Sequence, residues 1–281
     1  MSIFKDLDQP VQKLIREATQ QIILPAFYEQ IPQDKVFAKS DHSIVTTIDF
    51  EVQNFMQGQL QALLPGSGFL GEEETEWRTG DAQGEWVWIV DPIDGTHNFA
   101  SQIDQFGTMV ALWHLPTNRP IYGWIYLSVA DLMFSGGLSQ GVYCNDHSLL
   151  SITERLQKQL KEMTGLLNYG SFGPAKETMR ANSHHFRTID PSSCAAMKFA
   201  ALLQDKADFA VFGRAKIWDL SAGFALLEEL GGFAGKVTGL AMETPILSVD
   251  KPSQYAGWHL AVRQKENWPL VRDQLFENVE F

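Results

Sequence analysis

The segment from Trp86 to Phe99 constrains the fold more than any other part of the sequence. Its apolar start, 86–90, is typical of a buried strand, and the run ends abruptly at Asp91. Asp94 follows three residues later, and Gly95 permits a sharp turn that brings backbone N–H groups inward. Two carboxylates held this close repel each other, so they require a cation between them or a protonated carboxyl. All-oxygen ligation favours a hard ion such as Mg²⁺.

Two other acidic segments carry weaker signals. Glu72–Glu74 follows an apolar pair, and such a run by itself is most often a solvated loop. Asp219 comes at the start of a predicted helix, where an N-cap is the default interpretation. The 91–96 segment also fits a turn with a capping Asp. Taken one at a time, therefore, only the 91–96 segment stands out.

Helix-like and strand-like segments alternate along the chain. Helical spacing of apolar residues runs from Val11 to Ile23, where Pro25 is predicted to end the helix, and a second helix is predicted between Thr47 and Pro65. Strands are predicted over 86–90, 106–113, 121–127, 165–169 and 209–212, and further helices over 194–203 and 219–230. This alternation predicts a layered α/β architecture, with an N-terminal half, 1–140, and a C-terminal half, 141–281.

Composition narrows the choice of partner and compartment. The chain has 22 basic and 34 acidic residues, a net charge of −12, which argues against nucleic acid or an anionic membrane as the main partner. An anionic substrate would then need a bound cation to reverse the local charge. Cys144 and Cys194 are the only cysteines, so no disulfide framework is available. Without a signal-like N-terminus or an apolar run of about 18 residues, we expect a cytoplasmic protein that does not enter the membrane.

Cys194 carries no catalytic signal of its own. It lies at the start of the predicted helix 194–203 and is interpreted as a small apolar residue near the edge of the substrate site. A catalytic thiolate would require a paired histidine, and the sequence places none beside it.

Several ordered motifs together resemble the inositol monophosphatase family of metal-dependent, lithium-sensitive phosphatases. They are Ile44–Asp49, Gly71–Glu73, Trp88–Phe99, Gly141–Asn145 and Trp218–Gly232, the last of which begins Trp-Asp-Leu-Ser-Ala-Gly. The likeness extends from about residue 40 to residue 235 in the expected order. It implies the family's α/β (α+β) fold, a layered α-β-α-β-α sandwich, and the activity of a phosphoric monoester hydrolase.

The resemblance also implies a set of metal ligands for two or three Mg²⁺ ions. These ligands are the side chains of Glu72, Asp91, Asp94 and Asp219 and the backbone carbonyl of Ile93. Asp91 would be shared between two ions. Cations in that arrangement suit phosphoryl transfer, which needs charge neutralisation and in-line placement of a nucleophile.

Further roles follow from the same resemblance. Glu72 and Thr96, with Asp49 hydrogen-bonded to the threonine, would position and deprotonate the attacking water. The backbone amides of Gly95 and Thr96 would hold the phosphate. The catalytic group is therefore expected to be Glu72, Thr96 and Asp49.

The substrate side departs from the inositol-preferring members of the family. Phe212 stands where those members carry a glutamate, and it is reminiscent of the branch that dephosphorylates 3′-phosphoadenosine 5′-phosphate; it equally fits the last core residue of a strand. Arg214 and Lys216 would either meet a second anionic group of the substrate or lie solvated on the surface. We expect hydrolysis of inositol monophosphate or a similar polyol or sugar phosphate, with adenosine bisphosphate and histidinol phosphate as alternatives.

Two expectations about partners rest on the resemblance alone. The family often pairs its subunits, so we expect a homodimer that binds a small-molecule phosphate ester. One bacterial relative acts in transcription complexes, which leaves open a function of a different class, as a binding partner in such a complex.

Overall fold

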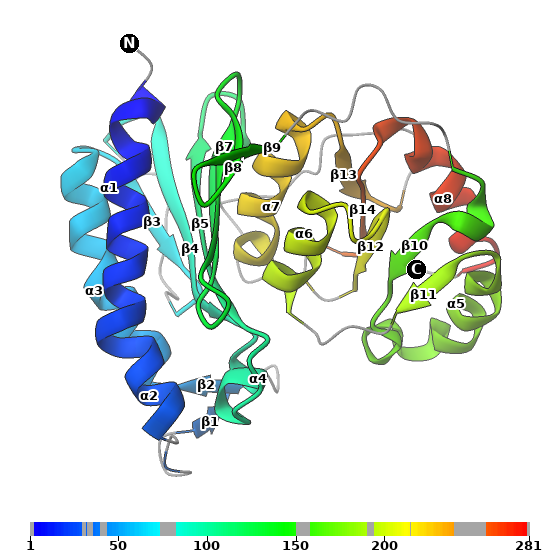
Figure 1. The fold of residues 1–281 in the computed structure, drawn as a ribbon, viewed down its shortest axis with the longest axis horizontal. Coiled ribbons are helices and arrows are strands. Elements are labelled where there is room, and N and C mark those ends of the chain that lie inside the picture. Colours follow the sequence, from blue (N-terminus) through cyan, green and yellow to red (C-terminus); the bar gives the residue numbers. More distant parts are fainter. Residues whose placement is uncertain are drawn as a thin grey trace.

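The structure is a computed structural model that describes residues 3–29, 32, 36–39, 44–73, 83–149, 158–189, 194–213, 215–238 and 257–279. These residues form the α-β-α-β-α sandwich that the resemblance implies, with its layers seen edge-on in Figure 1. The outer layer on one side consists of α1 (Ile3–Ala18), α2 (Leu24–Glu29) and α3 (Thr47–Leu63), and the middle layer consists of α6 (Ala195–Leu203) and α7 (Ile217–Glu229). The other outer layer contains α5 (Lys176–Asn182) and α8 (Trp268–Leu275).

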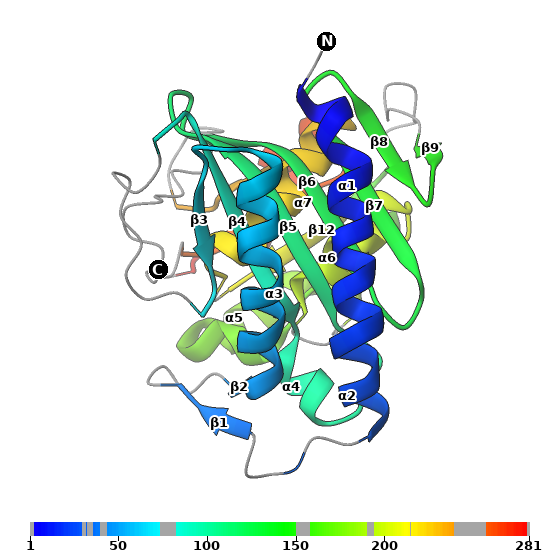
Figure 2. The ribbon, with the colours of Figure 1, turned by 90° about the vertical axis from the view of Figure 1, so that its left-hand side faces the viewer.

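Two sheets separate these helical layers. The seven-stranded sheet has the order β3 (Gly68–Gly71), β4 (Trp86–Asp94), β5 (Gly107–His114), β6 (Arg119–Leu127), β7 (Leu132–Gly137), β8 (Gly141–Cys144) and β9 (His147–Leu149). The five-stranded sheet has the order β11 (Arg187–Ile189), β10 (Thr164–Leu166), β12 (Phe209–Phe212), β14 (His259–Val262) and β13 (Phe233–Lys236). A small hairpin of β1 (Val36–Ala38) and β2 (Ile44–Thr46) and the short helix α4 (Thr96–Ala100) lie together near one end of the molecule (Figures 1 and 2). Short 3-10 turns span Leu160–Glu162, Tyr169–Ala175, Ser183–His185 and Lys265–Asn267.

The strands β4, β5 and β6 of the seven-stranded sheet are buried on both faces, which explains the continuous apolar run at the start of β4. Trp88 and Val90 pack toward α1 and α3, whereas Val87 and Ile89 pack toward α6 and α7. Figure 2 shows α1 and α3 lying across one face of this sheet. A strand covered on both faces has no polar alternation. The two aspartates of β4, Asp91 and Asp94, accordingly lie at its carboxyl end, after the apolar run.

Three predicted element ends were wrong. The strand predicted over 165–169 ends at Leu166, and a 3-10 turn begins at Tyr169. Pro25 does not end the first helix, because a π-helical turn, Thr19–Ile23, follows α1 and the chain continues into α2. Pro25 is the second residue of α2, and the wider turn before it removes the regular hydrogen-bond pattern that a proline would break. The strand predicted over 86–90 extends to Asp94, with a shift of register against β5 between Asp91 and Asp94.

The helix α7 lies very close to the seven-stranded sheet. A Cβ atom on Gly123 of β6 would lie 2.4 Å from the carbonyl oxygen of Ala222 in α7, so only glycine allows this approach. The contact fixes α7, and with it Asp219 in the first turn of the helix, against the sheet that carries Asp91 and Asp94.

Two expectations about the whole chain stay predictions. The first sheet extends to Leu149 in β9, but strand pairing does not define domains, so the division between 1–140 and 141–281 stays a prediction. Among the described helices, none combines the length and the apolar character that crossing a bilayer requires. The cytoplasmic location also stays a prediction.

Candidate active site

Strand register places the first two acidic motifs side by side. The strands β3 and β4 are parallel, and Gly71 pairs with Val90 at their carboxyl ends. The backbone N–H of Glu72 then donates to the carbonyl of Val90 at 3.0 Å, which puts Glu72 next to Asp91. Acids far apart in the sequence thus meet because parallel strands end at the same edge of a sheet.

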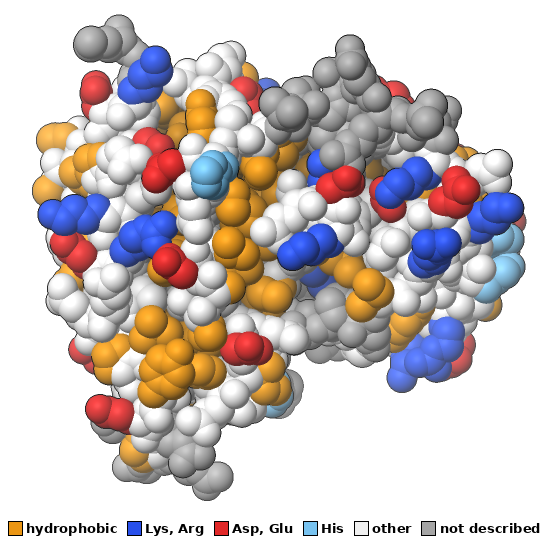
Figure 3. Space-filling model, viewed as in Figure 1, with side chains coloured by type: hydrophobic (Ala, Val, Ile, Leu, Met, Phe, Trp, Pro, Cys, Tyr) orange, Lys and Arg blue, Asp and Glu red, His pale blue; other side chains and the backbone are white. Residues whose placement is uncertain are grey.

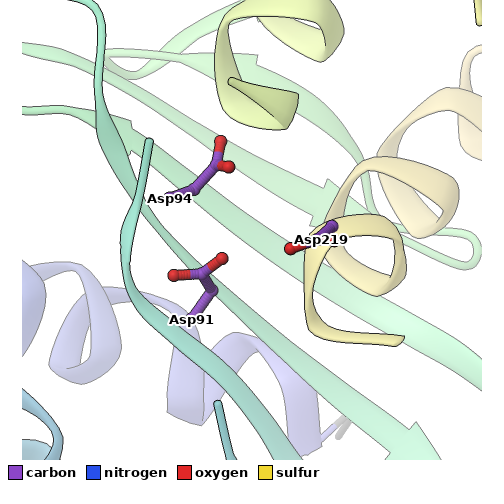
Figure 4. A group of neighbouring side chains, drawn as sticks. All are labelled: Asp91, Asp94 and Asp219. Carbon is purple, nitrogen blue, oxygen red and sulfur yellow. The ribbon is translucent and has the colours of Figure 1, made fainter. Parts of the chain in front are cut away.

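Three aspartates converge at this edge. One carboxylate oxygen from each of Asp91, Asp94 and Asp219 lies within 4.8 Å of the others. Figure 4 shows their side chains pointing toward a common space from β4 and from the first turn of α7. Asp91 and Asp94 are buried, with exposed fractions of 1% and 7%.

The carboxylates disturb one another strongly. Burial and then the charge of Glu72 raise the pKa of Asp91 and of Asp219 well above the ordinary value. Burial also raises the pKa of Asp94, although hydrogen bonds from the backbone of Ala196 and from the thiol of Cys194 oppose this rise. Such a cluster favours any positive charge that enters it.

The cluster fits a hard divalent cation. Among the described residues, Asp91 Oδ1 is buried and has no hydrogen-bond partner, and leaving a buried acceptor unpaired is costly. Its neighbours are carboxylate oxygens, the donors that Mg²⁺ and similar ions prefer. Asp91, Asp94 and Asp219 could therefore hold a metal ion.

Asp219 and Asp49 are the N3 residues of capping boxes, and the N-cap of α7 is Lys216, so Asp219 is not the N-cap residue that the sequence suggested. One oxygen of Asp219 accepts from the backbone N–H of Lys216 at 2.6 Å, at the start of α7. Asp49 lies in a capping box, where its Oδ2 accepts from the backbone N–H of Thr46 at 2.8 Å. Capping fixes both side chains and does not exclude a second role, since a carboxylate has two oxygens.

Thr96 links Asp49 to the end of strand β4. Its hydroxyl lies 3.0 Å from Asp49 Oδ1 and 2.9 Å from the carbonyl oxygen of Ile93. Gly95 before it has φ +87°, a left-handed conformation that favours glycine and starts α4. Burial raises the pKa of Asp49 to about 6, while hydrogen bonds from Thr46 and Thr96 oppose the rise.

Lys39 is a contact that sequence reasoning missed. Its Nζ lies 2.8 Å from an oxygen of Glu72 and 2.8 Å from an oxygen of Glu73, and all three side chains are largely buried. Burial would lower the pKa of Lys39, but the two carboxylates outweigh burial and raise it. Glu72 is thus paired with this lysine and lies outside the group of three converging aspartates. Nothing around Lys39 in the sequence marks it.

A cavity of about 130 Å³ opens beside the aspartates. It is lined by Asp94, Asn168, Ser171, Ala195, Lys198, Phe212, Gly213, Ala215 and Asp219. The position of Phe212 fits both a residue beside the substrate and a core residue at the end of a strand. It lines the cavity, and its ring also stacks on that of Phe199, with centroids 4.8 Å apart. Lys216 lies at the start of α7 with its Nζ 5.4 Å from the Trp218 ring centroid, and Arg214 lies outside the described residues.

Lys198 is the second residue that sequence reasoning missed. It is 5% exposed, and its Nζ donates to the carbonyl of Val211 at 2.9 Å and lies 5.1 Å from the Phe212 ring centroid. A lysine inside the apolar segment Ala195–Leu203 could have signalled it, because lysine is rarely buried in a core without a specific reason. The face in Figure 3 shows acidic and basic side chains interspersed.

The sequence matches one family model over most of its length. The model is described as the inositol monophosphatase family and covers residues 5–266. An inositol-1-monophosphatase from Bacillus subtilis (strain 168) is 26% identical over 247 residues, or 85% of this chain and 88% of that protein. A 3′(2′),5′-bisphosphate nucleotidase, CysQ, from Escherichia coli (strain K12) is 26% identical over 226 residues, or 80% of this chain and 88% of that protein.

Solved structures share the fold. The extragenic suppressor protein SuhB from Bartonella henselae has a TM-score of 0.78 at 21% identity, covering 97% of this chain and 99% of that one. An IMPase from Thermotoga maritima has a TM-score of 0.77 at 21% identity, covering 94% of each chain. Given the match of the family model, the chain belongs to the inositol monophosphatase family. It is accordingly a hydrolase of the phosphatase class.

Proposed function

We propose that the protein is a Mg²⁺-dependent phosphomonoesterase that hydrolyses a small phosphorylated metabolite and releases inorganic phosphate. The observation that carries this proposal is the convergence of Asp91, Asp94 and Asp219, with Asp91 Oδ1 buried and without a partner among the described residues. Three carboxylates this close together are tolerable when a divalent ion compensates their charge.

The metal ligands proposed are those implied by the family resemblance. Asp91, Asp94 and Asp219 would hold the ions with the carbonyl of Ile93, and Glu72 would join them once it leaves Lys39. Bound ions supply positive charge to the phosphoryl oxygens and lower the pKa of water. Two or three ions fit the number of carboxylates, and that number belongs to the proposal.

Thr96, Asp49 and Glu72 have the contacts needed to handle the attacking water. The Thr96 hydroxyl can donate its proton to Asp49 Oδ1 or to the carbonyl oxygen of Ile93. Its oxygen can in turn accept a hydrogen bond from a water molecule. We assign to Thr96 the orientation of the water and to Glu72 the acceptance of its proton. The first-turn amides of α4, at Gly95 and Thr96, would hold the phosphate, since such amides have no acceptor within the helix.

The leading substrate is inositol monophosphate or a similar polyol or sugar phosphate. Support comes from the resemblance and from the inositol-1-monophosphatase among the relatives. The cavity beside Asp94 and Asp219 would take the leaving group, and polar groups at Asn168 and Ser171 suit the hydroxyls of a polyol. Histidinol phosphate remains an alternative without a specific contact in its favour.

A second candidate is a nucleotide that carries two phosphates, such as 3′-phosphoadenosine 5′-phosphate. Lys198 and Phe212 favour it, because they present a buried cation and an aromatic ring in the same cavity. An aromatic ring stacks on a base, and an ammonium pairs with a second phosphate. The CysQ nucleotidase among the relatives is in accord with this candidate.

Phosphate release from a substrate panel tests the proposal. Inositol 1-phosphate, glycerol 2-phosphate, histidinol phosphate and 3′-phosphoadenosine 5′-phosphate are incubated with the enzyme and Mg²⁺, and each is repeated with excess chelator. We expect turnover that the chelator abolishes. A Lys198→Met variant should raise KM for the bisphosphate by about tenfold or more and leave glycerol 2-phosphate nearly unchanged if the nucleotide is the substrate.

Absence of turnover for all four esters, with the protein folded, would favour a binding role in a transcription complex instead. Sedimentation of the purified protein tests the homodimer that we propose from the family resemblance. A single species at 31.6 kDa would contradict it.

A further inference from the structure

Asp94 is held from one side by the start of α6. The thiol of Cys194 lies 2.9 Å from Asp94 Oδ2, and the backbone N–H of Ala196 donates to the same oxygen. The backbone of Ala195 adds to this stabilisation of the Asp94 carboxylate. Two groups from a segment a hundred residues away therefore converge on one oxygen of a proposed metal ligand.

The Cys194 side chain contacts Asp94 as well as the first turn of its own helix. Cys194 is the N-cap residue of α6, and its sulfur interacts with the backbone N–H of Met197 while the S–H group is free to donate to Asp94. It is completely buried. Gly95 provides the space, because a Cβ atom at that position would lie 3.3 Å from Cys194 Cβ and 3.4 Å from its Sγ. The turn after Asp94 and the thiol thus fit against each other.

We propose that Cys194 is a positioning residue that orients Asp94 for cation binding. The inference rests on the proposed function, since it assumes that Asp94 is a ligand. The thiol S–H donates to Oδ2 and restricts rotation of the carboxylate, so that the group meets the ion in one orientation. The interpretation of Cys194 as a merely apolar residue at a helix start is therefore incomplete.

The second observation that supports this role is an oxygen of Asp91, beside Asp94, that has no hydrogen-bond partner in the described part of the chain. Asp91 Oδ1 is buried and lies in the cluster to which Asp94 contributes, so the two carboxylates would serve the same ion. Outer groups that hydrogen-bond to metal ligands typically change metal affinity or activity by about 10–100-fold when they are removed. A thiol is a weak donor and Ala196 remains in place, so we expect an effect near the lower end, about tenfold.

Two matched pairs of variants test the role of the thiol. Cys194→Ser keeps a donor and Cys194→Ala removes it. Cys194→Thr and Cys194→Val repeat the comparison with side chains of the same shape, in case the Ala variant fails to fold. Cys144→Ala, on β8 and away from the aspartates, is the control for loss of a thiol in general.

Binding of Mn²⁺ and Mg²⁺ is measured by titration calorimetry on the full chain without substrate, and phosphate release is measured separately with the best ester of the panel. We expect the Cys194→Ser and Cys194→Thr variants to bind the ion with a dissociation constant within about threefold of that of the native protein. Ala and Val should bind about tenfold more weakly, with a matching rise in the Mg²⁺ concentration needed for half-maximal activity and little change of kcat at saturating Mg²⁺. Cys144→Ala should match the native protein.

Equal ion affinity within each pair would overturn the positioning role, whatever the thermal stabilities of the variants. A native protein that binds no divalent ion would instead overturn the proposed function. The two failures are distinguishable because the first needs a working native protein as its reference.

Discussion

Replacing Asp91 by Asn should stabilise the protein in the absence of divalent ions while it abolishes turnover. Asp91 is buried, its Oδ1 has no partner among the described residues, and two other carboxylates lie within 4.8 Å. The side chain therefore costs stability until a cation arrives. Asparagine has nearly the same shape, carries no charge, and can donate to the neighbouring carboxylates.

A Coulomb estimate gives the scale of the gain. Two unit charges 4.8 Å apart repel by about 3.5 kcal/mol at an effective dielectric constant of about 20. Removing one of three charges removes two such repulsions. Burial raises the pKa values of Asp91, Asp94 and Asp219, and any proton that the cluster takes up lowers this repulsion. We therefore expect a net gain of about 1–3 kcal/mol, equivalent to a rise in melting temperature of about 3–8 °C.

Thermal unfolding at pH 7.5, with chelator and with Mg²⁺, measures the stability of the metal-free protein and the increase in stability that Mg²⁺ causes. Mg²⁺ at a hundred times its dissociation constant should add about 2.7 kcal/mol to the native protein and much less to Asp91→Asn. Asp104→Asn removes an exposed carboxylate and should change neither melting curve. A variant less stable than the native protein without metal, with the same response to Mg²⁺, would refute the reasoning.

Three further perturbations separate the roles of the surrounding groups. Burial raises the pKa of Asp49 from 3.8 to about 6 and that of Glu73 from 4.5 to about 7, so the folded protein binds more protons than the unfolded chain between these values. Metal-free stability should therefore fall as pH rises from about 4 to 7, and a flat profile in chemical denaturation would contradict this. Thr96→Val should lower kcat by about 10²–10³-fold and Thr96→Ser by far less, with equal losses arguing against the hydroxyl. Lys39→Met releases Glu72 and should lower the Mg²⁺ concentration for half-maximal activity several-fold. Lys13→Met, which removes an exposed ion pair, should leave that concentration unchanged. A higher Mg²⁺ requirement after Lys39→Met would show instead that the lysine assists ion binding.

The features of the fold and site that could be predicted are those determined by residues close together in the sequence. Asp91 and Asp94 follow a strand whose apolar run has no polar alternation, and that pattern predicts carboxylates at the buried end of a strand. The layered architecture followed from alternating periodicities and from the resemblance, and the structure confirms it. The register of β3 against β4 explains why Glu72 belongs to the same edge.

Contacts between distant segments could not be predicted in the same way. Lys39 follows β1 and pairs with Glu72, 33 residues away in the sequence, and nothing in the local sequence reports that contact. Cys194 meets Asp94 across a hundred residues, so its surroundings suggested only a small apolar side chain. Pro25 misled the helix prediction because a π-helical turn has no clear signature in apolar spacing. Lys198 did leave a signal, a charge inside an apolar helix, that its neighbours alone could not interpret.

Anomalous diffraction from crystals grown with Mn²⁺ tests the central claim most directly, because the ion is located without reference to activity. We predict an anomalous peak bounded by the carboxylates of Asp91, Asp94 and Asp219, at Mn–O distances of about 2.0–2.4 Å, and loss of that peak in Asp91→Asn. Crystals with Mn²⁺ in the solution but no peak among these carboxylates, or with the three side chains turned toward basic residues, would contradict the claim that they form a metal site.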